Sequence, residues 1–283
     1  MHINYWTELK RSKFGRAGLA MISILVFLAL AAPLIAPYDP WAYVGTPLAP
    51  PSGEHFLGLN DIGQDIFSEL LYGSRTTLMI SSGVAIFSTL ISLAFGLAAA
   101  LWGGLVERVI LRLIDIMLII PVFLIAILVA SFFQPGVTTL IILLTCLFWP
   151  PGARIIRAQA LSIKQKQHLT AASSFGAGKG YLVYRHLLPD LYPIVTVNFI
   201  QVIRRAVFME AGLAFLGVFD PVQKSWGLML HYASEFIFTG AWKWWLVPTG
   251  FMISYTIIAF VLIGYALESA LDPRLRRQVY VGH

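Results

Sequence analysis

The chain has 283 residues, of which 58% are hydrophobic and only 12% are charged. A soluble domain is about 45–50% apolar and about 25% charged, so this composition excludes an ordinary soluble protein and indicates a membrane protein. The formal net charge is +6. Membrane proteins collect Lys and Arg in cytoplasmic loops for topological reasons, so this charge does not predict a nucleic-acid partner.

Uncharged apolar runs predict six transmembrane helices, because one span needs about 20 mostly apolar residues. The run Ile116–Ala153 is too long for one span and contains Pro135–Gly136, a dipeptide typical of turns, so we expect one helix on each side of it. A fifth span, from Leu191 to about Gly212, is apolar but carries charged residues. The remaining spans are expected at Ala17–Pro37, Thr76–Val106 and Trp244–Leu267.

Lys and Arg gather in the N-terminal segment, in alternate loops and at the C-terminus. This placement predicts that both ends of the chain are cytoplasmic, because positive residues are enriched in cytoplasmic loops. The chain then divides into a cytoplasmic segment (1–16), a first span (17–37), an extracytoplasmic segment (38–75) and a core that holds the other spans (76–283). Within the core, a cytoplasmic loop is expected at about 161–190.

The stretch SSFGAGKGYLVYRHLLPD, Ser173–Asp190, looks at first like a phosphate-binding loop. The P-loop pattern is G-x-x-x-x-G-K-[ST]. When Lys179 is aligned with the motif lysine, Ser173 stands at the first glycine position and Gly180 stands where the magnesium-binding hydroxyl belongs. We therefore expect no nucleotide at this stretch. Its pattern of helix, glycine turn and helix is compatible with a docking segment or with an ordinary inner loop. Physical arguments alone favour the two interpretations about equally.

The same stretch, extended to TAASSFGAGKGYLVYRHLLP, resembles the EAA loop of prokaryotic ABC importer permeases. That loop reads E-A-A-x-x-x-G followed by H-x-L-P, and Thr170 stands where the name-giving Glu is usual. The resemblance implies that this segment docks on an ATPase subunit. The residues expected at that dock are Thr170, Ala171, Ala172, Gly176, Ala177, His186 and Pro189.

Two more stretches resemble the dipeptide/oligopeptide/nickel branch of these permeases. HFLGLNDIGQDIFSELLYGSR, His55–Arg75, looks like its H-x-L-G-T-D-x-x-G-R-D-x-x-S-R-x-x-x-G-x-R segment, with Asn60, Gln64 and Glu69 in place of an Asp and two Arg. MEAGLAFLGVFDPVQKSWGLML, Met209–Leu230, resembles E-A-x-L-S-F-L-G-x-G followed by a proline and S-W-G-x-M-L. The resemblance extends to the tail LDPRLRR and is to the second, C-type permease subunit of such an importer.

This resemblance implies an all-α, six-span ABC importer type I permease fold in the prokaryotic plasma (inner) membrane. It implies that the chain forms half of the conduit of an ATP-driven importer of di- or oligopeptides. The implied partners are a second homologous permease, two ATPase subunits and an extracytoplasmic binding protein. ATP and Mg would bind the separate ATPase subunits, so no cofactor is expected on this chain.

Ionisable residues inside a span are costly and mark candidate functional positions. Arg204 and Arg205 lie near the middle of the fifth span, and Glu210 follows them. Adjacent helical positions point about 100° apart, so the two arginines cannot face one direction squarely. One hypothesis places these three residues on the translocation pathway, where an arginine would attract an anionic group such as a peptide carboxylate. The other is an ion pair with a partner chain. Asp115 is expected to pair with Arg112 at i,i+3 spacing.

Two alternatives from other classes compete with the importer. A membrane enzyme would need nucleophilic or ionisable residues clustered at one depth, and the sequence has no such cluster, so no catalytic residues are expected. An ion-coupled carrier would favour broken helices and inverted repeats, and neither is evident in the sequence. His55, His231 and scattered methionines are too dispersed to predict a metal site. The cargo of an importer stays open between peptides and nickel or a metal chelate, because selectivity in this family resides largely on the binding protein.

Overall fold

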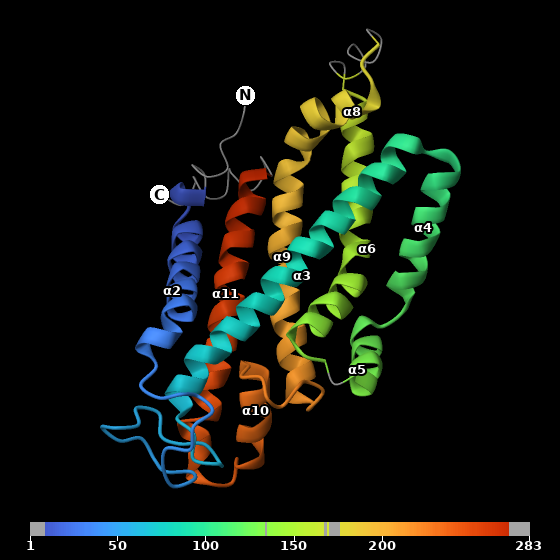
Figure 1. The fold of residues 1–283 in the computed structure, drawn as a ribbon. Helices are drawn as coiled ribbons and strands as arrows, with labels where there is room; N and C mark the ends of the chain where they lie inside the picture. The colour runs from blue at the N-terminus through green and yellow to red at the C-terminus, as the bar shows by residue number, and fades with distance from the viewer. Residues whose placement is uncertain (1–8, 134, 167–168, 170–175, 272–283) are drawn as a thin grey trace.

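The computed structural model describes residues 9–133, 135–166, 169 and 176–271, and the regular elements named among them are helices. Most of the long helices run side by side as a bundle, and α3 crosses the others obliquely (Figure 1). The long helices are α2 (Lys13–Ile35), α3 (Ile66–Trp102), α6 (Val137–Lys164), α9 (Leu188–Phe215) and α11 (Leu246–Leu271). The shorter elements are α4 (Gly104–Ile119), α5 (Val122–Phe133), α8 (Lys179–Leu182), η1 (Val183–Leu187), α10 (Trp226–Glu235) and η2 (Gly240–Lys243).

Five helical segments of the described chain are long and apolar enough to cross a membrane. A sixth span results only if α4 and α5 count as one, and these two helices are bent by 82°. The expectation of one helix between Ile116 and the Pro135–Gly136 turn is therefore wrong. Ile120 is extended, with ψ 129°, because the residue before a proline, here Pro121, avoids the helical region. The turn itself is confirmed, since α6 begins after its N-cap Gly136.

Helix α3 begins at Ile66, well before the uncharged run that starts at Thr76. Asp65 caps this helix, and its Oδ2 accepts a hydrogen bond from the Ser68 backbone N–H at 2.8 Å. An Asp at this position satisfies an otherwise unpaired N–H of the first turn. Part of the predicted extracytoplasmic segment is therefore the first turns of a long helix.

Small residues let the central helices approach closely. A Cβ on Gly96 of α3 would lie 2.8 Å from the Ala153 carbonyl oxygen of α6. Nearby, the Ser92 hydroxyl donates to the Trp149 carbonyl oxygen of α6 at 2.7 Å. In a membrane, such close packing and interhelical hydrogen bonds hold helices together, because lipid provides no hydrophobic drive. Helix α3 accordingly packs on both α6 and α9, and these helices contribute most of the largest buried apolar cluster.

Candidate functional site

The segment between α6 and α9 projects beyond the bundle at the end where α9 begins (Figure 1). Thr170, Ala171 and Ala172, three residues expected at the dock, lie outside the described residues. Gly176 has a φ of +83°, in the left-handed region that favours glycine. It therefore forms the turn that precedes α8, and Ala177 follows it as a half-buried residue.

The later part of this segment, α8 and η1, is helical and is anchored where it meets α9. Buried Leu187 and Leu191 pack in one cluster with Leu169 and with residues at the end of α6. Lys166 Nζ also donates to Asp190 Oδ2 at 2.8 Å, which ties the two ends of the segment together. The base of the segment is thus held on α6 and α9, so a force on the projecting part would be transmitted to both helices.

Two of the expected docking residues lie on this anchored part. His186, in η1, makes an edge-to-face contact with the Tyr181 ring at 5.7 Å between centroids. Pro189 is exposed near the start of α9. The structure therefore places Gly176, Ala177, His186 and Pro189 around one projecting turn and helix start.

The two arginines of α9 point toward different helices, as their spacing predicts. The Arg205 guanidinium lies over the Phe148 ring of α6, 5.5 Å from its centroid. Arg204 lines a pocket of about 140 Å³ with Glu268 of α11. Both arginines are exposed on the single chain. A charged side chain within a membrane-spanning helix is costly against hydrocarbon, so such positions favour protein or water beside them.

Glu210 does not share that exposed face. Its side chain is completely buried, and its Oε2 accepts a hydrogen bond from Thr77 Oγ1 of α3 at 3.1 Å. Its Oε1 has no hydrogen-bond partner among the described residues. The carboxyl group is therefore a contact between α3 and α9, separate from the two arginines.

Asp115 is also placed differently from the expectation. It pairs with Arg154 of α6 instead of Arg112 on its own helix. A second pair joins the same two helices, since Arg157 Nε donates to Glu107 Oε1 at 2.8 Å. The expectation of a local pair was wrong because the fold brings a cation of α6 opposite each α4 carboxylate. These contacts fasten α4 to α6.

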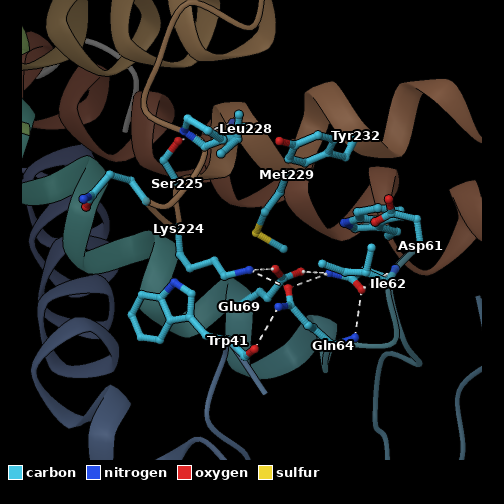
Figure 2. Close-up of a pocket in the computed structure, with 14 residues that line it drawn as sticks. Trp41, Asp61, Ile62, Gln64, Glu69, Lys224, Ser225, Leu228, Met229 and Tyr232 are labelled. Atoms are coloured by element: carbon cyan, nitrogen blue, oxygen red, sulfur yellow. Dashed lines mark hydrogen bonds and ion pairs between the residues drawn. The ribbon is translucent and has the colours of Figure 1, made fainter. Parts of the chain in front are cut away.

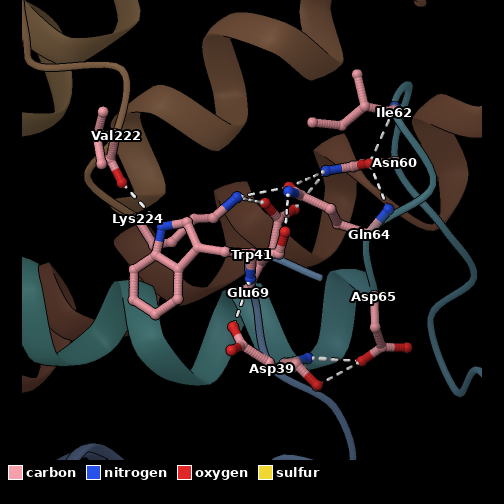
Figure 3. A network of polar contacts seen from close by, with 10 residues as sticks. Asp39, Trp41, Asn60, Ile62, Gln64, Asp65, Glu69, Val222 and Lys224 are labelled. Atoms are coloured by element: carbon pink, nitrogen blue, oxygen red, sulfur yellow. Dashed lines mark hydrogen bonds and ion pairs between the residues drawn. The ribbon is translucent and has the colours of Figure 1, made fainter. Parts of the chain in front are cut away.

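At the opposite end of the bundle, two stretches far apart in sequence meet in one polar network. Lys224 Nζ lies 2.5 Å from Glu69 Oε1 and 2.6 Å from Gln64 Oε1. Asn60 Nδ2 donates to both Gln64 Oε1 and Glu69 Oε2 at 3.1 Å. The Gln64 amide also donates to the Trp41 carbonyl oxygen at 3.0 Å. Figure 3 shows Lys224 reaching from the loop before α10 toward the first turn of α3.

This network forms one wall of a pocket of about 240 Å³ (Figure 2). Asp61, Met229 and Tyr232 line other parts of it. Burial raises the pKa of Asp61, and the negative charge of Glu235 raises it further, while Lys224 opposes the shift. Burial is also the first cause that raises the pKa of Tyr232, followed by the charge of Asp61.

Sequence reasoning missed Lys224 as a partner of Glu69. The available signal was a charge change inside a motif, because Glu69 stands where the resembled pattern has an arginine. A buried acid at that position needs a cation from elsewhere, and the other motif supplies one at Lys224. The sequence alone did not show that the stretch with Glu69 and the stretch with Lys224 lie close together in space.

The histidines weighed as metal ligands lie in separate polar contacts. His55 Nδ1 lies 3.1 Å from Asp65 Oδ1. His231 Nδ1 lies 2.7 Å from the Phe215 carbonyl oxygen. Over the part of the chain that the structure describes, no group of three or more His, Cys, Asp or Glu residues is arranged to hold a metal ion.

Comparison with known proteins places these features in a family. Residues 92–277 match the model of the binding-protein-dependent transport system inner membrane component. Residues 4–51 match the N-terminal TM domain of oligopeptide transport permease C. The two matches together cover both ends of the chain.

Individual relatives agree with the family match. The chain is 33% identical over 274 residues to the dipeptide transport system permease protein DppC of Bacillus subtilis (strain 168), across 96% of this chain and 85% of the relative. It is 31% identical over 275 residues to the oligopeptide transport system permease protein OppC of the same organism, across 95% of this chain and 88% of the relative.

A solved structure supports the fold. A chain of the inward-facing MetNI methionine ABC transporter superposes with a TM-score of 0.54 at 21% identity, and the match covers 70% of this chain and 96% of that chain. The chain therefore belongs to the binding-protein-dependent inner membrane components, as a multi-pass, non-catalytic permease subunit of the C type found in bacterial peptide ABC importers.

Proposed function

We propose that this chain forms, with a second homologous permease, the membrane pathway of an ATP-driven importer of di- or oligopeptides. The observation that carries the proposal is its likeness, over nearly the full chain, to dipeptide and oligopeptide permease subunits. Two ATPase subunits would bind ATP and Mg, and an extracytoplasmic binding protein would deliver the cargo. Both ends of this chain would then be cytoplasmic, as the distribution of Lys and Arg predicts.

The projecting segment between α6 and α9 is the proposed dock for an ATPase subunit. Its contact residues would be Thr170, Ala171, Ala172, Gly176, Ala177, His186 and Pro189. The anchoring of its base on α6 and α9 supports this role, because movement of a docked helix would reach both membrane helices as a rigid-body shift.

The exposed face of α9 that carries Arg204 and Arg205 is the proposed pathway side. Two exposed guanidinium groups within a membrane-spanning helix need a water-filled pathway or a partner chain beside them. Glu210 lies away from this face, so we assign it to the contact between α3 and α9. A peptide carboxylate passing Arg204 or Arg205 would gain favourable charge interaction.

Reconstitution tests this function directly. The complete importer, with its binding protein, is placed in proteoliposomes and supplied with ATP and labelled di-, tri- and oligopeptides. ATP-dependent peptide uptake is the expected result. Uptake of nickel or a metal chelate without peptide uptake would overturn the peptide assignment, and uptake without any ATPase subunit would overturn the importer class.

The arginines are tested in the same system. Arg204→Gln and Arg205→Gln should each lower uptake of a peptide with a free carboxylate more than uptake of its C-terminal amide. Asp115→Asn, at an exposed pair between α4 and α6, serves as a control outside the proposed pathway. Equal loss for the acid and the amide would instead indicate a structural role in subunit assembly.

A further inference from the structure

The pocket of about 240 Å³ shown in Figure 2 has more negative than positive side chains in its lining. Its charged lining residues are Asp61, Glu69 and Lys224. Lys224 Nζ is held by Glu69 Oε1 at 2.5 Å and by Gln64 Oε1 at 2.6 Å. Figure 2 shows Lys224 turned toward Glu69, with Asp61 on the other side of the pocket. Asp61 is therefore the lining carboxylate that Lys224 does not pair with.

The ion pairs among the described residues do not include Asp61. Its side chain is nevertheless half-buried. Burial raises the pKa of Asp61, and the charge of Glu235 raises it further. Burial also raises the pKa of Tyr232, and three nearby carboxylates, that of Asp61 first, add to this shift. An acid that is perturbed in this way and lies in a pocket is a candidate binding group.

The rest of the lining suits an organic cation. Trp41, Tyr232 and Trp245 contribute aromatic side chains, and Met229 contributes a polarisable thioether. The face of an aromatic ring attracts a cation within about 6 Å, and tryptophan does so most strongly. Trp245 is 1% exposed, and its Nε1 has no hydrogen-bond partner among the described residues. A ligand with a carbonyl oxygen close to its cationic group would bring an acceptor to this wall.

The size and the position of the pocket limit the choice of ligand. Pockets that enclose drug-sized molecules are about 300–1,000 Å³, so a pocket of about 240 Å³ holds a small molecule or one end of a longer one. The pocket lies at the end of the bundle opposite the projecting segment between α6 and α9 (Figure 1). Because the proposed function assigns ATPase docking to that segment, the pocket lies on the side from which the cargo arrives.

We propose that this pocket binds the N-terminal ammonium group of a peptide, with Asp61 as the counter-ion. The identification of the ligand as a peptide rests on the proposed function, whereas the preference for a cation rests on the charges and rings of the pocket. The ammonium group donates to the Asp61 carboxylate, and the first peptide carbonyl oxygen supplies the acceptor for Trp245 Nε1. The pocket encloses the first residue of the peptide, and the following residues extend out of it.

Two peptides that differ only at the N-terminus test the site on the purified, complete importer in detergent, without its binding protein. Trialanine amide keeps the ammonium group and has no carboxylate for Arg204 or Arg205 to attract. N-acetyl-trialanine amide has neither charge. Isothermal titration calorimetry should show that the first peptide binds about tenfold more tightly. Asp61→Asn should remove most of this preference. Equal affinities for the natural sequence, or a preference that survives Asp61→Asn, would overturn the proposal.

The matched control is Glu54→Gln, which removes an exposed acid of the segment between α2 and α3 that does not line the pocket. It should leave the preference unchanged. Nα-acetyl-lysine amide carries its ammonium group on a side chain, and tighter binding of this compound than of trialanine amide would overturn the assignment to a peptide N-terminus.

Uptake assays in proteoliposomes separate this site from the proposed function. Peptide uptake by an importer that shows no ammonium preference in the binding assay would reject the site and keep the peptide importer. Uptake of nickel alone, with the ammonium preference intact, would reject the peptide importer and keep a cation-binding pocket at Asp61.

Discussion

Replacement of Lys224 with methionine should destabilise the end of the helix bundle that holds Glu69 by about 3 kcal/mol. The Lys224 side chain is 13% exposed and the Glu69 side chain is 5% exposed, so solvent screens this pair little. Without the cation, Glu69 keeps only the hydrogen bond from Asn60 among its described contacts. A buried carboxylate left without its ion-pair partner accounts for the predicted loss, since breaking such a pair costs about 3–5 kcal/mol.

A double-mutant cycle separates the pair from the rest of the network. Glu69→Gln alone should destabilise the protein by a similar amount, because Lys224 then becomes the unpaired buried charge. The double variant Lys224→Met/Glu69→Gln should be less destabilised than the sum of the two, with a coupling energy of about 2 kcal/mol. Reversible denaturant unfolding in detergent micelles, followed by tryptophan fluorescence, measures each corner of the cycle.

The control is Lys243→Met, which removes an exposed cation that contacts the Trp242 ring at 5.9 Å. Its effect should stay within about 1 kcal/mol. If Lys224→Met proved equally mild and the cycle were additive, the buried pair would not stabilise this end of the bundle and the reasoning would fail.

Three further predictions concern other parts of the chain. Gly176→Val should strain a backbone with φ +83° by about 1–2 kcal/mol. It should lower transport-coupled ATPase activity in proteoliposomes, while membrane insertion stays normal. Unchanged coupling would show that this turn is not part of the proposed dock. Gly96→Leu should lower the thermal unfolding temperature, because its Cβ would lie 2.8 Å from a backbone carbonyl oxygen of α6, whereas Gly250→Ala, with open space around its Cβ, should not. Asp61→Asn should stabilise the protein at pH 7, because burial and Glu235 raise the folded-state pKa of Asp61. The ionised acid therefore opposes folding above that pKa. This advantage should shrink as the pH falls to the ordinary pKa of Asp, and a pH-independent difference in unfolding temperature would contradict it.

Much of the fold follows from local sequence. Apolar run lengths locate the long helices, because a membrane span must bury about 20 residues in hydrocarbon. The turn before α6 follows from Pro135–Gly136 in the same way. The bend of 82° between α4 and α5 was missed. A single proline such as Pro121 is compatible with a kinked span or with a full break, and the packing of the neighbouring helices determines which one forms.

The candidate sites were less accessible to sequence reasoning. The motifs indicated where the projecting segment between α6 and α9 lies, and helical geometry separated the directions of Arg204 and Arg205. The partners of Asp115 and Glu69 came from distant parts of the chain, at Arg154 and Lys224. Sequence spacing predicts pairs only within one helix, because nothing in the spacing gives the distance between helices.

The sequence by itself determined that this protein is a multi-span permease, since hydrocarbon burial and motif spacing are local properties of the chain. The tertiary structure alone decided which charges are paired and which remain exposed. It joins Glu69 to Lys224 and buries Glu210 against Thr77, while Arg204 and Arg205 remain at the surface. The physical reason is that the stability of a charge depends on its surroundings, and those surroundings are set by helices that are distant in sequence and adjacent in space.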